Sequence, residues 1–120
     1  MRLVHHPATG DNTSVLATEI EVADSLWSQT RGLMFRRSIP EEYALVFEFG
    51  TARPRDLHML FVPFPIDAIW TNSDVVQRVE RLHPWRGIAR DRGDRIVELP
   101  AGAATAVEAG DRVVLTDDER

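Results

Sequence analysis

Apolar and polar residues follow one another in short runs along the chain, a pattern typical of strands rather than long helices. Residues 15–22 (VLATEIEV) alternate as a half-buried antiparallel strand does. Residues 43–49 (YALVFEF) are apolar on nearly both faces, which predicts a central strand. Shorter strands are expected at 96–99 (IVEL) and 112–115 (RVVL).

The most apolar run is LHMLFVPFPIDAIW, residues 57–70. Its two prolines cannot donate to a sheet ladder, so one strand should end near Val62 and the next should begin near Ile66. The sequence TNSD at 71–74 is a turn signal before a second apolar pair, which predicts a hairpin.

Two helices are predicted among these strands. Asp24 or Ser25 can cap a short helix over about 24–34, because apolar residues follow at helical spacing. An alanine-rich segment predicts a weaker helix at about 101–108. Helices do not alternate with strands, so we expect one mainly-β domain over 1–120, a β-sandwich of jelly-roll-like type or a partly closed barrel, with the first helix packed across the sheet.

Several strings, in this order and spacing, resemble domain-of-unknown-function family 192, a set of small prokaryotic domains. They are TRGLMFR (30–36), FPIDAIW (64–70), VV (75–76), PW (84–85), VELPAGAA (97–104) and AGDRV (109–113). The resemblance spans about residues 16–115. It implies a jelly-roll-like sandwich with a short helix carrying the RGLM string, and it implies neither a reaction nor a cofactor.

The chain departs from the resembled family in one segment. Met59, Pro65 and Asp67 match the pattern, but His58 stands where relatives often have an aromatic residue. Apolar residues replace the Lys, Asn and Thr that relatives often carry next; these are Leu60, Phe61 and Val62. If those polar groups bind something in relatives, this chain has lost them.

Composition narrows the setting. There is no cysteine, which excludes disulfides and thiol catalysis, and all 14 basic residues are arginine against 19 acidic ones, a net charge of −5. This balance indicates either a haloarchaeal-type adaptation to salt or GC-rich coding, and it makes nucleic acid an unlikely partner. No signal-like run opens the sequence, and the 57–70 run is too short for a membrane helix, so a soluble cytoplasmic protein is expected.

Asp67 is the first candidate site residue, because a carboxylate inside an apolar run is costly unless it is paired or hydrogen-bonded. Arg31, on the predicted helix, could satisfy it with a planar guanidinium. The favoured interpretation is a structural anchor, either an Arg31–Asp67 pair or Asp67 accepting backbone N–H bonds. The alternative is a carboxylate that acts as an acid or base.

The second candidate is a binding face. Residues 83–95 predict a long polar loop in which Trp85 and Arg86 have the chemistry of interface hot spots, and His58 could lie nearby. The four histidines show no metal-ligand spacing and no glycine-rich phosphate loop is present, so neither a metal nor a cofactor is expected.

Two classes of function stay open from the sequence. The favoured one is a non-catalytic domain that binds a small ligand or a protein partner at the 83–95 loop. The alternative is a small hydrolase-like or lyase-like enzyme that uses Asp67 and His58 as an acid/base couple. A pocket joining these two residues would favour the enzyme.

Overall fold

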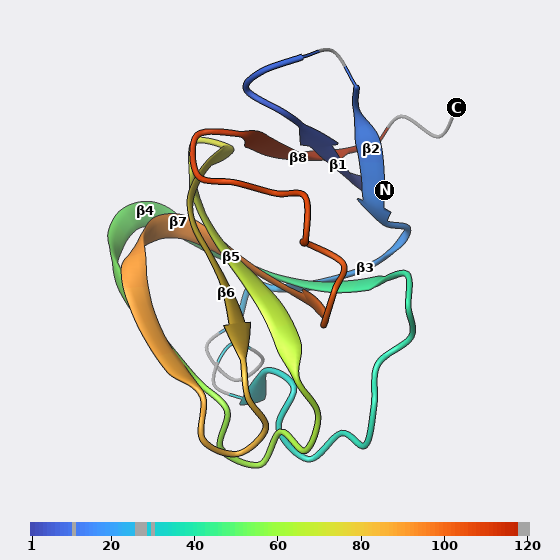
Figure 1. Cartoon of the computed structure of the whole chain (residues 1–120). Helices are drawn as coiled ribbons and strands as arrows, with labels where there is room; N and C mark the ends of the chain where they lie inside the picture. Colours follow the sequence, from blue (N-terminus) through green and yellow to red (C-terminus); the bar gives the residue numbers. More distant parts are fainter. Residues whose placement is uncertain (11, 26–28, 30, 118–120) are drawn as a thin grey trace.

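The computed structural model describes residues 1–10, 12–25, 29 and 31–117. Eight strands form one open mixed sheet in the order β2-β1-β8-β6-β5-β7-β4-β3 (Figure 1). Their bounds are β1 Arg2–His6, β2 Ser14–Ala17, β3 Glu19–Ala23, β4 Tyr43–His58, β5 Ile66–Asn72, β6 Val75–Leu82, β7 Ile88–Pro100 and β8 Arg112–Thr116. Among the described residues, neighbouring strands pair antiparallel except β3 with β4, which pair in parallel. The mainly-β prediction is therefore confirmed, whereas a sandwich or barrel is not.

The first half of strand β4, which contains the 43–49 run, is apolar on both faces as predicted, but it lies next to the edge strand β3 rather than at the centre of the sheet. Alternate residues of β4 enter two different cores: Leu45 and Phe47 lie in one, and Ala44 and Val46 lie in the other. The first core is closed by residues from the 31–39 and 57–64 segments, while the second is closed by β1, β8 and the turns after β7. Two buried faces explain why these strands lack a simple alternation.

The predicted hairpin is confirmed. β5 begins at Ile66 and pairs with β6, and Ser73 and Asp74 join them with φ angles of 49° and 69°. Positive φ at both central residues is the geometry that matches the twist of a two-residue hairpin.

The long loop expected at 83–95 is wrong. Only residues 83–87 connect β6 to β7, and β7 then runs from Ile88 as the partner of the second half of β4. This ribbon curls away from the rest of the sheet (Figure 1). Its side chains are largely exposed, so its polar, glycine-containing sequence resembles a loop although its backbone is extended. The strand that was expected to end near Val62 ends at His58.

The predicted helix at 24–34 falls partly on residues 26–28 and 30, which lie outside the described part. Gln29 and Arg31 have helical backbone, Gln29 N donates to Ser25 O, and turns follow from Gly32. The weaker helix at 101–108 is replaced by consecutive turns, in which Ala103 N donates to Pro100 O and Gly102 has a φ of +97°. A left-handed residue two positions after the strand stops a helix from propagating.

The run at 15–22 is also divided. The N–H groups of Thr18 and Glu19 both donate to Glu42 O, and the chain changes direction there. β2 then pairs with β1, and β3 pairs with β4. β1 itself was not predicted, because its sequence RLVHH is short and half polar.

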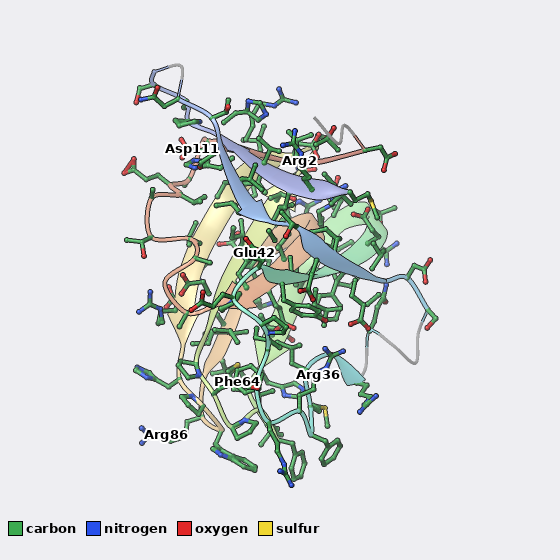
Figure 2. All side chains as sticks on the ribbon, turned by 90° about the vertical axis from the view of Figure 1, so that its right-hand side faces the viewer. Arg2, Arg36, Glu42, Phe64, Arg86 and Asp111 are labelled. Carbon is green, nitrogen blue, oxygen red and sulfur yellow. The ribbon has the colours of Figure 1, made fainter. Side chains whose placement is uncertain are left out.

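The molecule has two distinct ends. β1, β2 and β8 lie at one end, where Figure 2 labels Arg2 and Asp111. The connections between β4 and β5 and between β6 and β7 lie at the other end, where Phe64 and Arg86 are labelled (Figures 1 and 2).

Candidate functional site

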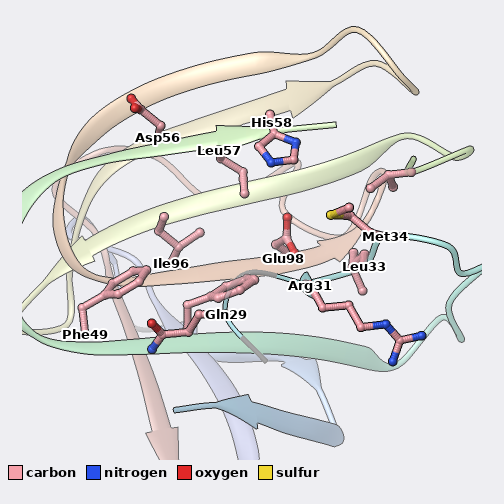
Figure 3. Close-up of a pocket in the computed structure, with 13 residues that line it drawn as sticks. Gln29, Arg31, Leu33, Met34, Phe49, Asp56, Leu57, His58, Ile96 and Glu98 are labelled. Carbon is pink, nitrogen blue, oxygen red and sulfur yellow. The ribbon is translucent and has the colours of Figure 1, made fainter. Parts of the chain in front are cut away.

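A pocket of about 140 Å³ opens beside the first core, between the β4–β7 face of the sheet and residues 29–34 (Figure 3). Most of its lining is apolar. The aliphatic and aromatic walls are Leu33, Phe47, Phe49, Leu57, Val62 and Ile96. Such a lining favours an apolar group over water.

One carboxyl group interrupts this apolar lining. Glu98 is only 3% exposed, and Figure 3 shows its side chain pointing into the pocket from β7. Its Oε1 has no hydrogen-bond partner among the described residues. Burial raises the pKa of Glu98 to about 8, although the positive charge of Arg36 acts in the opposite direction. Glu98 is therefore largely protonated at neutral pH, and a neutral carboxyl both donates and accepts a hydrogen bond.

Gly32 brings the 29–34 segment close to this carboxyl. Its φ is +50°, and a Cβ placed there would lie 3.3 Å from the Phe47 ring and 3.8 Å from Glu98 Oε1. Gln29 fixes the same segment to the sheet, since its Nε2 donates to Ala23 O at 3.1 Å and to Glu48 O at 2.9 Å. The narrow approach at Gly32 thus shapes one wall of the pocket.

Polar side chains at the rim are more exposed. His58 lies at the end of β4, and its Nδ1 accepts a hydrogen bond from Leu60 N at 3.2 Å. Arg31 also lines the pocket, but Figure 3 shows its guanidinium directed away from Glu98. Asp56 is exposed and forms a 3.4 Å ion pair with Arg90.

Asp67 does not reach this pocket, and its expected pairing with Arg31 is wrong. Its Oδ1 accepts a 2.5 Å hydrogen bond from Arg81, and its Oδ2 accepts from Gly102 N at 2.9 Å and Ala104 N at 3.0 Å. Asp67 thus takes the backbone-bonded arrangement, but it holds the turns after β7 rather than a helix.

The geometry also separates the proposed acid/base couple. Asp67 alternates with Ala68 along β5, so it faces the second core, where Ala104 packs, while Ala68 enters the first. His58 lines the pocket on the side of the first core. The two residues therefore lie on opposite faces of the sheet.

A different arginine of the TRGLMFR string makes the anchoring contacts. Arg36 donates to Glu21 Oε1 at 3.0 Å and to Tyr43 Oη at 2.9 Å, and Tyr43 Oη donates to the same Glu21 oxygen at 2.6 Å. The hydrogen bonds from Tyr43 and Arg36 lower the pKa of Glu21. This triad fixes the end of the 31–36 segment against β3 and β4.

Of the predicted recognition residues, His58 lines the pocket, whereas Trp85 and Arg86 lie outside it. Trp85 is 52% exposed and contacts Phe61, which in turn stacks on Phe35, with ring centroids 5.9 Å and 4.9 Å apart. We call these three residues the aromatic patch. Arg86 is exposed beside it, whereas Arg95 is occupied by Glu48 and Asp74.

The described part of the chain contains no group of three or more histidine, aspartate or glutamate side chains placed to hold a metal ion. It also contains no helix long and apolar enough to cross a membrane.

These features define a small β-rich domain with one largely apolar pocket and a buried carboxyl in it. The chain belongs to domain-of-unknown-function family 192 (DUF192), described as an "Uncharacterized ACR", whose family model matches residues 7–115. The resemblance seen in the sequence is thus confirmed, while the haloarchaeal-type composition is not.

Solved structures share this fold. A protein of Sinorhizobium meliloti 1021, described as a "putative transcription regulator", is 25% identical with a TM-score of 0.81, over 94% of this chain and 92% of that chain. A protein of unknown function from Novosphingobium aromaticivorans DSM 12444 is 19% identical with a TM-score of 0.76, over 96% of this chain and 84% of that chain. No curated protein matches the chain.

Sequence reasoning missed Glu98, although the signal was present. Glu98 interrupts the apolar run IVEL just as Asp67 interrupts FPIDAIW. The rule that a carboxylate in an apolar strand needs an explanation applies equally to both. The sequence predicts that the segment at 24–34 packs across the sheet, but it does not show that residues 31–34 cover the strand face that carries Glu98.

Proposed function

We propose that this domain binds a small amphipathic group, with the size of one aromatic ring, in the pocket above Glu98. The observation that carries the proposal is the buried Oε1 of Glu98, which no described residue satisfies. A buried polar atom without a partner costs about 1–3 kcal/mol, so its retention favours a role in binding.

The size of the pocket sets the size of the ligand. An engineered cavity of about 150 Å³ lined by aliphatic and aromatic side chains binds benzene. The pocket here has a similar volume, about 140 Å³, and a similar lining. A single ring or a short branched chain fits such a space.

The chemistry of Glu98 sets the polar part of the ligand. Because the buried carboxyl is protonated at neutral pH, it offers one donor and one acceptor. An amide or a hydroxyl group complements it without bringing a charge into the apolar pocket. The preferred ligand is therefore a neutral ring or chain with one such group.

A binding role is favoured over catalysis. Among the described residues that line the pocket, none is serine, threonine or cysteine, so no hydroxyl or thiol nucleophile is at hand. Glu98, with its raised pKa, could transfer a proton, but the acid/base couple expected from the sequence is divided, since His58 lines the pocket and Asp67 faces the other core. The acidic net charge of −5 likewise gives no support to DNA binding. A cytoplasmic, single-domain protein stays a prediction.

The proposal can be tested with benzamide and toluene, two rings of similar size of which only benzamide has donors and acceptors. Binding is followed by NMR chemical-shift changes of residues that line the pocket. We expect benzamide to bind about fivefold more tightly than toluene, as one net hydrogen bond of about 1 kcal/mol predicts.

Glu98→Leu should abolish the difference between the two compounds, whereas Glu108→Gln, which removes an exposed carboxylate, should preserve it. Absence of shift changes for both compounds would overturn the proposal. Equal affinities for both would show that Glu98 takes no part in recognition.

A further inference from the structure

The aromatic patch is held by a backbone conformation that its residues rarely adopt. Phe35, Phe61 and Trp85 have φ angles of 69°, 61° and 64°. The left-handed region costs a non-glycine residue about 1–2 kcal/mol. Phe35 N donates to Phe61 O at 2.8 Å, and Trp85 N donates to Val62 O at 3.1 Å. These backbone hydrogen bonds join the three loops that carry Phe35, Phe61 and Trp85.

These side chains do not use that conformation to enter a core. Phe35 is 66% exposed, Phe61 44% and Trp85 52%. Leu60, which precedes Phe61, and Ile88, three residues after Trp85, are exposed as well. A cluster of large apolar side chains displayed on strained loops is the kind of surface that a partner covers.

The charge around the patch is opposite to that of the chain. The loops 31–37, 59–65 and 83–88 contain four arginines and no carboxylate, although the whole chain has a net charge of −5. Arg36 is paired with Glu21, while Arg31, Arg37 and Arg86 are exposed. Carboxylates of a partner would therefore find complementary charge around an apolar centre.

The patch is continuous with the pocket. Met34 and Val62 line the pocket. In the chain, Phe35 directly follows Met34, and Phe61 directly precedes Val62. A ligand group in the pocket thus has the aromatic patch beside it as a second contact surface. A free compound of one ring does not use that surface, whereas a peptide does.

We propose that the natural occupant is an extended segment of a partner protein that places a tyrosine side chain in the pocket, its phenol on Glu98, and apolar and acidic neighbours on the patch and its arginines. This inference rests on the proposed function, since it names the ligand of the same pocket. Tyrosine combines an apolar ring with a polar tip, and aromatic anchors in pockets carry much of the energy of interfaces.

The test compares three probes by calorimetry: N-acetyl-tyrosine amide, the blocked pentapeptide Asp-Leu-Tyr-Leu-Asp, and the same peptide with lysine for both aspartates. We expect the acidic peptide to bind at least about tenfold more tightly than the amino-acid amide, as contacts of a hot-spot kind predict. The lysine peptide should bind no better than the amide. Replacing the tyrosine of the acidic peptide by phenylalanine should lower the affinity of that peptide for the domain about fivefold.

Two variants separate the patch from the pocket. Trp85→Ser with Phe61→Ser should reduce the affinity of the acidic peptide to that of the amide, and should leave benzamide binding unchanged, which also shows that the variant is folded. Arg37→Glu with Arg86→Glu should reverse the preference between the acidic and lysine peptides.

Other outcomes are decisive in the opposite direction. If benzamide binds but the acidic peptide gains nothing over the amide, the inference fails and the proposed function stands. If neither benzamide nor the peptides bind, both fail. Trp85-dependent binding to vesicles of anionic lipid, or Trp85-dependent self-association in sedimentation, without peptide binding, would assign the patch to a membrane or to a second copy and overturn the inference.

Discussion

His5 Nε2 lies 2.7 Å from Asp111 Oδ2, although the two residues are 106 positions apart in the chain. Both residues are buried, and Asp111 also accepts hydrogen bonds from Ala8 N at 2.9 Å and Glu108 N at 3.0 Å. This one carboxylate thereby joins the first strand, β1, to the turn that precedes the last strand, β8. We expect Asp111→Asn to lower the free energy of unfolding by about 3 kcal/mol, measured by urea denaturation.

The pH dependence of the same residue gives a second readout. Burial alone would raise the pKa of Asp111, but the N–H of Ala8 and the contact with His5 outweigh it, so the pKa is lowered from 3.8. A lowered pKa contributes stability above pH 3.8, and this is lost as the pH falls through the folded-state pKa. Asp117→Asn, at an exposed position, should change neither the free energy of unfolding nor its dependence on pH. An effect equal to that of Asp111→Asn would contradict the role given to Asp111.

Asp67→Asn should destabilise the fold by about 3 kcal/mol, because it removes the charge that Arg81 and two backbone N–H groups share in a buried setting. Arg81→Ala should cost less, since the Arg81 side chain is 51% exposed and its ion pair is screened by solvent. Chemical denaturation of both variants measures the order. If the Arg81 variant has the lower free energy of unfolding, the ion pair rather than the backbone contacts holds Asp67.

Glu98 predicts the opposite pH trend. Its pKa is raised from 4.5 to about 8, so the folded protein keeps a proton between these values that the unfolded chain releases. The free energy of unfolding should then fall as the pH rises through this window, by at most about 1.4 kcal/mol per pH unit. Glu98→Gln should flatten the curve, as unfolding from pH 5 to pH 9 would reveal; an unchanged slope would show that Glu98 ionises normally.

Gly32→Ala should narrow the pocket as well as strain the backbone. The added Cβ would lie 3.3 Å from the Phe47 ring at a φ of +50°. We expect a loss of about 1–2 kcal/mol in stability and weaker benzamide binding. Gly50→Ala is the matched control, since Gly50 has a φ of +84° but nothing within 4 Å of its added Cβ. Equal affinities for benzamide in the two variants would remove Gly32 from the pocket wall.

The sequence predicted those parts of the fold that leave a local signature. The β5–β6 hairpin follows from a turn signal between two apolar runs, and the apolar run at 43–49 correctly indicated a strand with two buried faces, although β4 lies next to the edge strand β3. The β4–β7 ribbon leaves no such signature, because most of its residues are polar or exposed and only a few, such as Leu57 and Ala89, reach the first core. The strand β1 is only five residues long, and it is recognisable only once His5 is seen against Asp111.

The sequence predicted that a buried carboxyl group would mark the site, but it did not identify which residue carries that group. Reasoning on buried carboxylates pointed to Asp67, which proved to be bonded to Arg81 and the backbone, and the same reasoning applied to Glu98 leads to the pocket. His58 lines that pocket. The roles of His58, Arg31, Trp85 and Arg86 stay predictions. Which strand face Arg31 or Arg36 meets depends on turns that no periodicity records.

Phe35, Phe61 and Trp85 occupy positions where glycine would be relaxed. A laboratory selection for thermal stability alone would therefore tend to replace these rings, since glycine relieves the backbone at a modest loss of ring stacking. A selection for partner binding would keep them. The end of the molecule formed by the three loops is thus where the two selections diverge, and sequences that drift toward glycine there would mark relatives released from that partner.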